Sequence, residues 1–128
     1  MATIEGKAKE LLDKAEVVVI GTCSGDGIHL VATWGDFVRT IGIQDGNKIV
    51  IPAGGYRQTE QNLKGNNKVE VLVGSKQVEG TQGMGTGCRL SGTGEVQTSG
   101  ELYDLTKSEF PWARGAFVIH VDEIEYML

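Results

Sequence analysis

The residues that could bind an anion gather in one segment, Ile51-Pro-Ala-Gly-Gly-Tyr-Arg-Gln-Thr-Glu-Gln-Asn62. An apolar run ends there, two glycines turn the chain, and a short helix is predicted over residues 56–64. Glycines before a helix let backbone N–H groups converge, and a helix N-terminus carries a positive partial charge. Arg57 and Thr59 would add a charged donor and a hydroxyl, which suits a terminal phosphate. A glycine turn followed by a capped surface helix also explains these residues.

The rest of the sequence contains no set of residues that resembles an activated nucleophile, a carboxylate pair or a proton relay. His29 and His120 belong to no recognisable motif, so no metal site is predicted. Cys23 and Cys88 lack CxxC spacing and are expected to be free, buried thiols rather than a disulfide.

The elements that must position this segment are mostly short strands. Apolar residues at helical spacing predict an amphipathic helix between Ile4 and Ala15, and a second short helix is predicted over 101–110. Apolar runs and alternating patterns predict strands over residues 17–22, 28–34, 48–52, 68–73, 88–98 and 116–121, with an extension over 124–128.

The connections carry turn signals of their own. Asp45-Gly46 lies between the apolar runs 37–41 and 48–52 and predicts a hairpin. The glycine-rich stretch 77–87 is predicted to be a loop. Gly92 and Gly94 fall on the apolar side of their strand, which indicates a bend.

These patterns favour a mainly β fold, an antiparallel barrel with a few short helices, over a βαβ fold. No repeat or linker divides the chain, so residues 1–128 are expected to form a single domain. A net charge of −5 argues against a nucleic-acid surface and suits a cytoplasmic protein. No apolar run reaches the roughly 20 residues that span a bilayer, and the N-terminus lacks the apolar core of a signal peptide.

An ordered set of segments resembles the small bacterial FMN-binding proteins of the pyridoxamine 5′-phosphate oxidase-like superfamily. The resemblance covers nearly the whole chain and rests on 29–34 (HLVATW), 52–62 (PAGGYRQTEQN), 85–87 (GTG) and 112–114 (WAR). It implies an FMN-binding split-barrel domain that forms a homodimer with FMN near the interface. It also implies an electron carrier that works with a redox partner protein of unknown identity.

The resemblance further implies which residues hold the cofactor. The phosphate is expected at the turn 54–59, the isoalloxazine ring against the backbone near Thr33 and Trp34, and Trp112 of the partner subunit beside the ring. The predicted cofactor-binding residues are therefore Thr33, Trp34, Gly54, Gly55, Tyr56, Arg57, Gln58, Thr59 and Trp112.

The sequence departs from the family pattern at three positions. Gln58 stands where a lysine often precedes the threonine, and Arg57 is expected to supply the charge instead. Ala32 and Gly35 stand where asparagines are expected, so backbone donors would have to serve there. These changes bear on the affinity for FMN and on its redox potential.

Two other functions fit the sequence. The first is an enzyme of the same superfamily, such as a flavin reductase or an NAD(P)H-dependent oxidoreductase, which would need room for a second substrate beside the flavin. The second is a barrel that binds another ligand, such as haem, or serves as a scaffold, although neither histidine has the context of an axial ligand. The absorption spectrum of the purified protein distinguishes a flavoprotein from a haem protein or a scaffold, and steady-state oxidation of NADH or NADPH distinguishes an enzyme from a carrier.

Overall fold

The structure is a computed structural model and describes residues 2–128. Its elements in chain order are α1 (Gly6–Lys14), β1 (Val17–Ser24), β2 (Gly27–Trp34), α2 (Gly35–Ile41), β3 (Lys48–Ala53), α3 (Arg57–Gly65), β4 (Lys68–Gly80), β5 (Gly83–Gln97), α4 (Glu101–Glu109) and β6 (Gly115–Met127). The strands form one sheet in the order β2-β1-β4-β5-β6-β3, and every neighbouring pair is antiparallel. The predicted mainly β, antiparallel fold with short helices is confirmed.

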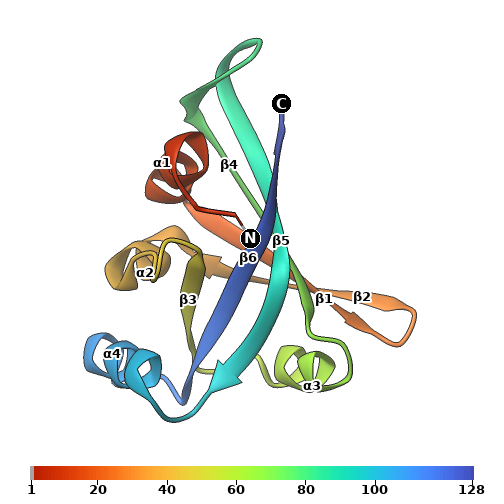
Figure 1. Ribbon diagram of the computed structural model, residues 1–128, viewed down its shortest axis with the longest axis vertical. Helices are drawn as coiled ribbons and strands as arrows, with labels where there is room; N and C mark the ends of the chain where they lie inside the picture. The colour runs from red at the N-terminus through yellow and green to blue at the C-terminus, as the bar shows by residue number, and fades with distance from the viewer. Residues whose placement is uncertain (1) are drawn as a thin grey trace.

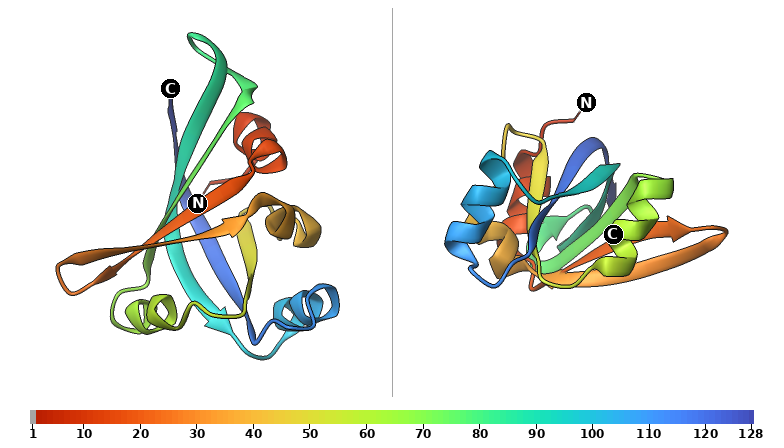
Figure 2. Two further views of the ribbon diagram at one scale, coloured as in Figure 1. Left: turned by 180° about the vertical axis from the view of Figure 1, so that it is seen from behind. Right: turned by 90° about the horizontal axis from the view of Figure 1, so that it is seen from below.

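The sheet curls so that its two end strands, β2 and β3, approach each other without pairing (Figures 1 and 2). β2 is hydrogen-bonded to β1, and β3 is hydrogen-bonded to β6. We call the gap between these two end strands the seam. In Figure 1, α1, α2 and α4 lie on one side of the curled sheet, and α3 lies apart from them near the β1–β2 hairpin. The sheet is therefore a barrel left open along one line.

The concave face of the sheet holds the main core. β1 alternates over Val18–Thr22 and β4 over Val69–Val73, with every second residue buried there, as expected for strands that have one face in the core. α1 closes this core with Ala8, Leu11 and Leu12. A smaller apolar cluster lies on the other face of β6, where α2 and α4 cover it. Because both faces of β6 are covered, its first residues form a continuous apolar run.

A bend in the β5–β6 pair gives the sheet part of its curl. The register shifts between Ser91 and Gly92, so that Asp122 has no partner on β5 and forms a bulge. A Cβ atom at position 92 would lie 1.8 Å from the carbonyl oxygen of His120, so only glycine fits at this approach. The predicted bend coincides with this bulge, where the two strands approach closely.

Two sequence predictions about local structure are wrong. Residues 37–41 belong to helix α2, so Asp45-Gly46 joins a helix to a strand instead of closing a hairpin. A short apolar run cannot be assigned by periodicity alone, and here Gly35, Val38 and Ile41 are buried at helical spacing. The stretch 77–87 is a hairpin and not a loop, because β4 and β5 continue to Gly80 and from Gly83.

The cysteines are both free, as predicted, but only one is buried. Cys88 lies in the core, and burial raises the pKa of its thiol to about 11. Cys23 is exposed near the β1–β2 turn, which corrects the expectation that both are buried. Within residues 2–128, none of the helices combines the length and the apolar character needed to cross a membrane.

Candidate functional site

A cavity of about 360 Å³ lies at the seam, within the size range of about 300–1,000 Å³ typical of small-molecule sites. β2 supplies one wall with Ala32, Thr33 and Trp34. The other wall is formed by the end of β3 and the turn that follows it, from Pro52 to Tyr56. Val17, Phe37 and Trp112 complete the lining. The cavity therefore exists because the two end strands of the sheet do not meet.

An aromatic cluster supports one end of the cavity. The ring of Phe37 lies 5.0 Å from that of Phe110 and 5.8 Å from that of Trp112, in tilted arrangements that favour aromatic pairs. Trp34 and Trp112 are 54% and 55% exposed although they line the cavity. A Cβ atom at position 54 would lie 3.0 Å from the Trp112 ring, so Gly54 lets the indole rest against the backbone. This end offers flat apolar surfaces to a planar ring.

Next to Tyr56, which lines the cavity, lies the N-terminus of α3. Tyr56 is the N-cap residue, and its side chain makes no capping hydrogen bond to the N–H groups of the first turn. Thr59, in that turn, is fully buried, and its hydroxyl has no hydrogen-bond partner among residues 2–128. Unpartnered buried polar groups are rare in folded proteins. Free N–H donors, a helix dipole and an unpartnered hydroxyl together fit a phosphate group.

Arg114 holds this turn in place and was not among the predicted site residues. Its guanidinium donates to the carbonyl oxygen of Gly54 at 3.2 Å and to that of Gly55 at 2.6 Å. It also forms an ion pair with Glu60 at 2.9 Å, and both side chains are largely buried. Arg114 thus neutralises the acidic residue of the first turn of α3, which would otherwise repel an anion at this end of the helix.

The structure places the predicted site residues in two adjoining groups. One group lines the cavity and comprises Thr33, Trp34, Gly54, Gly55, Tyr56 and Trp112. The other is the first turn of α3, where Arg57 and Gln58 are exposed and Thr59 is buried. The amide of Gln58 donates a hydrogen bond to the side-chain oxygen of Asn62 at 2.8 Å, so it is directed along the helix and not toward the free N–H groups of the first turn. Trp112 lines the same cavity as Trp34 within one chain. Its contribution to the site of a partner subunit stays a prediction.

The two departures from the expected asparagines have different structural settings. Ala32 lines the cavity, and its carbonyl oxygen accepts a hydrogen bond from the Tyr56 hydroxyl at 2.9 Å. Gly35 is buried where α1 meets α2, outside the cavity. A Cβ atom there would lie 1.9 Å from the Ala15 carbonyl oxygen, so no asparagine fits this backbone. Only position 32 can therefore affect a ligand directly.

The chain is similar to known proteins over nearly its whole length. The sequence profile described as pyridoxamine 5′-phosphate oxidase matches residues 4–128. The chain belongs to the pyridoxamine 5′-phosphate oxidase family. A curated relative, the FMN-binding protein of Nitratidesulfovibrio vulgaris (strain Miyazaki F), is 38% identical over 125 residues, which cover 98% of this chain and 99% of the relative.

Solved structures share the fold of this chain. HupZ of Group A Streptococcus matches with a TM-score of 0.71 and 21% identity, covering 92% of this chain and 91% of that chain. A putative pyridoxamine 5′-phosphate oxidase from Listeria innocua matches with a TM-score of 0.65 and 15% identity, covering 94% of each chain. These likenesses confirm the split-barrel fold predicted from the sequence.

Proposed function

We propose that this chain binds one FMN molecule non-covalently in the cavity at the seam. The observation that carries the proposal is that a surface for a flat ring and a place for a phosphate lie next to each other. Flat aromatic surfaces lie at Trp34 and Trp112, and an N-terminal helix turn with the unpartnered hydroxyl of Thr59 lies beyond Tyr56. An FMN-binding relative of 38% identity over nearly the full length supports the same ligand.

The function proposed for the loaded protein is electron transfer between redox partners. A bound flavin supplies the capacity to accept and release electrons, while the protein orients it and sets its electrostatic surroundings. The exposure of Trp34 and Trp112 supports this role, because the cavity opens to the surface there and a redox protein could approach it. The acidic composition, with a net charge of −5, supports a cytoplasmic location.

The protein is further proposed to work as a homodimer. Exposed apolar side chains gather on the convex face of β1, β2 and β4, where Ile28 is 81% exposed and Leu30 is 65% exposed. We call this surface the convex apolar patch, with Ile28, Leu30, Val19, Leu72, Val17 and Trp34 as members. Contiguous apolar patches of this kind mark protein interfaces. Because Val17 and Trp34 also line the cavity, a second copy seated on the patch would lie beside the ligand.

An absorption spectrum of the purified protein tests the proposed ligand. We expect the two visible bands of an oxidised flavin, either as purified or after incubation with FMN, and we expect denaturation to release FMN unchanged. A protein that stays colourless after incubation with FMN would contradict the proposal, and a haem spectrum would replace it with another ligand.

Steady-state assays distinguish the electron carrier from a flavin reductase or NAD(P)H-dependent oxidoreductase. The exposed end of the cavity leaves space that a nicotinamide could enter, which favours testing this alternative directly. For a carrier we expect no sustained NADH or NADPH oxidation above that of free FMN. Turnover that saturates with either nucleotide would assign the protein to the enzymes instead.

A further inference from the structure

Tyr56 has an unusual backbone conformation for its residue type. Its φ of 61° and ψ of 29° lie in the left-handed region, which costs a residue with a Cβ atom roughly 1–2 kcal/mol. Gly54 and Gly55 directly precede it and would adopt such a conformation more easily. The conformation therefore has to be held by contacts that the side chain makes.

Two contacts hold the Tyr56 side chain. Its ring packs edge-on against Phe117 in the core, with centroids 6.0 Å apart. Its hydroxyl donates to the carbonyl oxygen of Ala32 at 2.9 Å. Tyr56 follows β3 and Ala32 belongs to β2, so this hydrogen bond joins the two strands that the sheet leaves unpaired.

The bond also determines what the wall of β2 offers to a ligand. In an antiparallel strand, the N–H and C=O groups of one residue point to the same side, and alternate residues face opposite sides. Because the Ala32 carbonyl is reached from across the seam, the Ala32 N–H points to the seam as well, and so does the N–H of Trp34. Tyr56 occupies the carbonyl acceptor and leaves the N–H donor available to the cavity.

The hydroxyl remains a donor over the physiological range. Partial burial raises the pKa of the Tyr56 hydroxyl above its ordinary value. The phenol therefore stays protonated at neutral pH, so the contact with Ala32 does not depend on pH there.

We propose that Tyr56 is a positioning residue that spans the seam, fixes the separation of the cavity's two walls and orients the Ala32–Trp34 edge toward the flavin ring. This inference rests on the proposed binding of FMN. Tyr56 acts on the ring end of the ligand, whereas the first turn of α3 acts on the phosphate. Loss of the hydroxyl should therefore weaken riboflavin and FMN by the same factor.

The test is Tyr56→Phe, which keeps the ring and its packing on Phe117 and removes only the hydroxyl. Tyr103→Phe is the matched control, because Tyr103 is half-buried on α4 and does not line the cavity. We expect Tyr56→Phe to raise the Kd of FMN and of riboflavin equally, by about 3- to 10-fold, as for loss of one neutral hydrogen bond. The visible circular dichroism of the bound flavin should change shape, because the ring is held differently.

Unchanged affinity and superimposable visible circular dichroism for Tyr56→Phe would overturn the positioning role while leaving FMN binding intact. An equal loss in Tyr103→Phe would also overturn it, since the effect would then be general. A loss confined to FMN would place Tyr56 at the phosphate instead. A wild-type protein that binds neither flavin would refute the proposed function, and the role of Tyr56 with it.

Discussion

Thr59 is the residue on which the phosphate end of the site depends most directly. Its hydroxyl is buried in the first turn of α3 without a partner among residues 2–128, and a phosphate oxygen at the helix N-terminus would give it one. Arg57, two residues earlier at the start of α3, is exposed and has the length to reach the same oxygen atoms. Together they provide hydrogen-bond donors for the phosphate of FMN, a group that riboflavin lacks.

The double variant Arg57→Ala, Thr59→Ala should therefore weaken FMN far more than riboflavin. Hydrogen bonds to charged groups contribute about 1.5–3 kcal/mol each, so the Kd of FMN should rise by at least roughly 10-fold. Isothermal titration calorimetry with both ligands gives the comparison. Lys64→Ala, at the opposite end of the same helix, is the control and should change neither Kd. Equal losses for FMN and riboflavin would show that the phosphate lies elsewhere.

At the residue scale, contacts between neighbours in the sequence could be predicted, whereas contacts between residues far apart in the sequence could not. The glycine pair and helix start at 54–59 are adjacent in sequence, so their role could be predicted. Arg114 contacts Gly54 and Gly55 across separations of 60 and 59 residues, and no pattern in the sequence joins them. The hydrogen bond between Tyr56 and Ala32 could not be predicted for the same reason.

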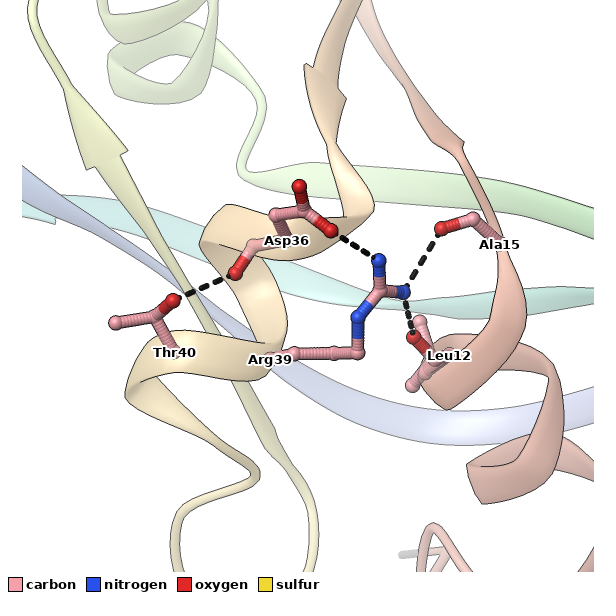
Figure 3. A network of polar contacts seen from close by, with 5 residues as sticks. All are labelled: Leu12, Ala15, Asp36, Arg39 and Thr40. Atoms are coloured by element: carbon pink, nitrogen blue, oxygen red, sulfur yellow. Dashed lines mark hydrogen bonds and ion pairs between the residues drawn. The ribbon is translucent and has the colours of Figure 1, made fainter.

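At the scale of elements, the joint between α1 and α2 determines where Trp34 lies. The Arg39 guanidinium on α2 donates to the carbonyl oxygens of Leu12 at 3.0 Å and Ala15 at 2.8 Å, at the C-terminal end of α1 (Figure 3). It also pairs with Asp36. A cation at a helix C-terminus satisfies free carbonyls and complements the dipole. The two helices are thereby fixed next to the end of β2.

This joint explains why residues 37–41 were wrongly predicted as a strand. Strands β1, β2, β4 and β6 could be predicted because alternation and β-branched runs reflect their burial directly. The short segment Gly35–Ile41 is held as a helix by contacts with α1, which are tertiary and leave little trace in its own sequence. Similarly, the glycines of 77–87 suggested a loop, although paired strands run through them.

Gly35→Ala tests the tightness of the joint. The added methyl group would clash with the Ala15 carbonyl oxygen and lie 2.7 Å from the Arg39 guanidinium, so we expect a loss of about 1–3 kcal/mol in the free energy of unfolding. Urea unfolding followed by circular dichroism measures it. Gly65→Ala is the control, since nothing lies within 4 Å of its Cβ position, and this variant should be neutral or slightly stabilised. Equal stability of the two variants would mean that the joint can relax.

At the scale of the whole molecule, the convex apolar patch is the surface that one chain leaves uncovered. Leu30 lies against Gly21, with 3.2 Å between its methyl group and the Cβ position of that glycine, and is 65% exposed. Arg89 pairs with Glu70 and Glu125 beside the patch. An apolar centre with a charged rim is the usual anatomy of a protein interface.

Leu30→Glu should dissociate the proposed homodimer. A carboxylate at the centre of an apolar interface opposes burial, and interface positions of this kind contribute about 2 kcal/mol or more, so the dimer Kd should rise at least roughly 30-fold. Sedimentation velocity across a concentration series measures the change. Met84→Glu, an equally exposed apolar residue near the β4–β5 turn, is the matched control. A wild-type protein that is monomeric at micromolar concentration would remove the dimer from the proposal.

Widening the seam breaks no hydrogen bond of the sheet, because β2 is paired only with β1 and β3 only with β6. Outward swinging of the β1–β2 hairpin, with the pairing of β1 to β4 kept, is therefore a local opening that needs less free energy than unfolding any strand. The Tyr56–Ala32 bond and a ligand between the walls both oppose that swing. Ligand release and the opening of the hairpin would then be the same event. The residence time of the cofactor would then depend on how often the seam opens, as well as on the strength of the cofactor's contacts.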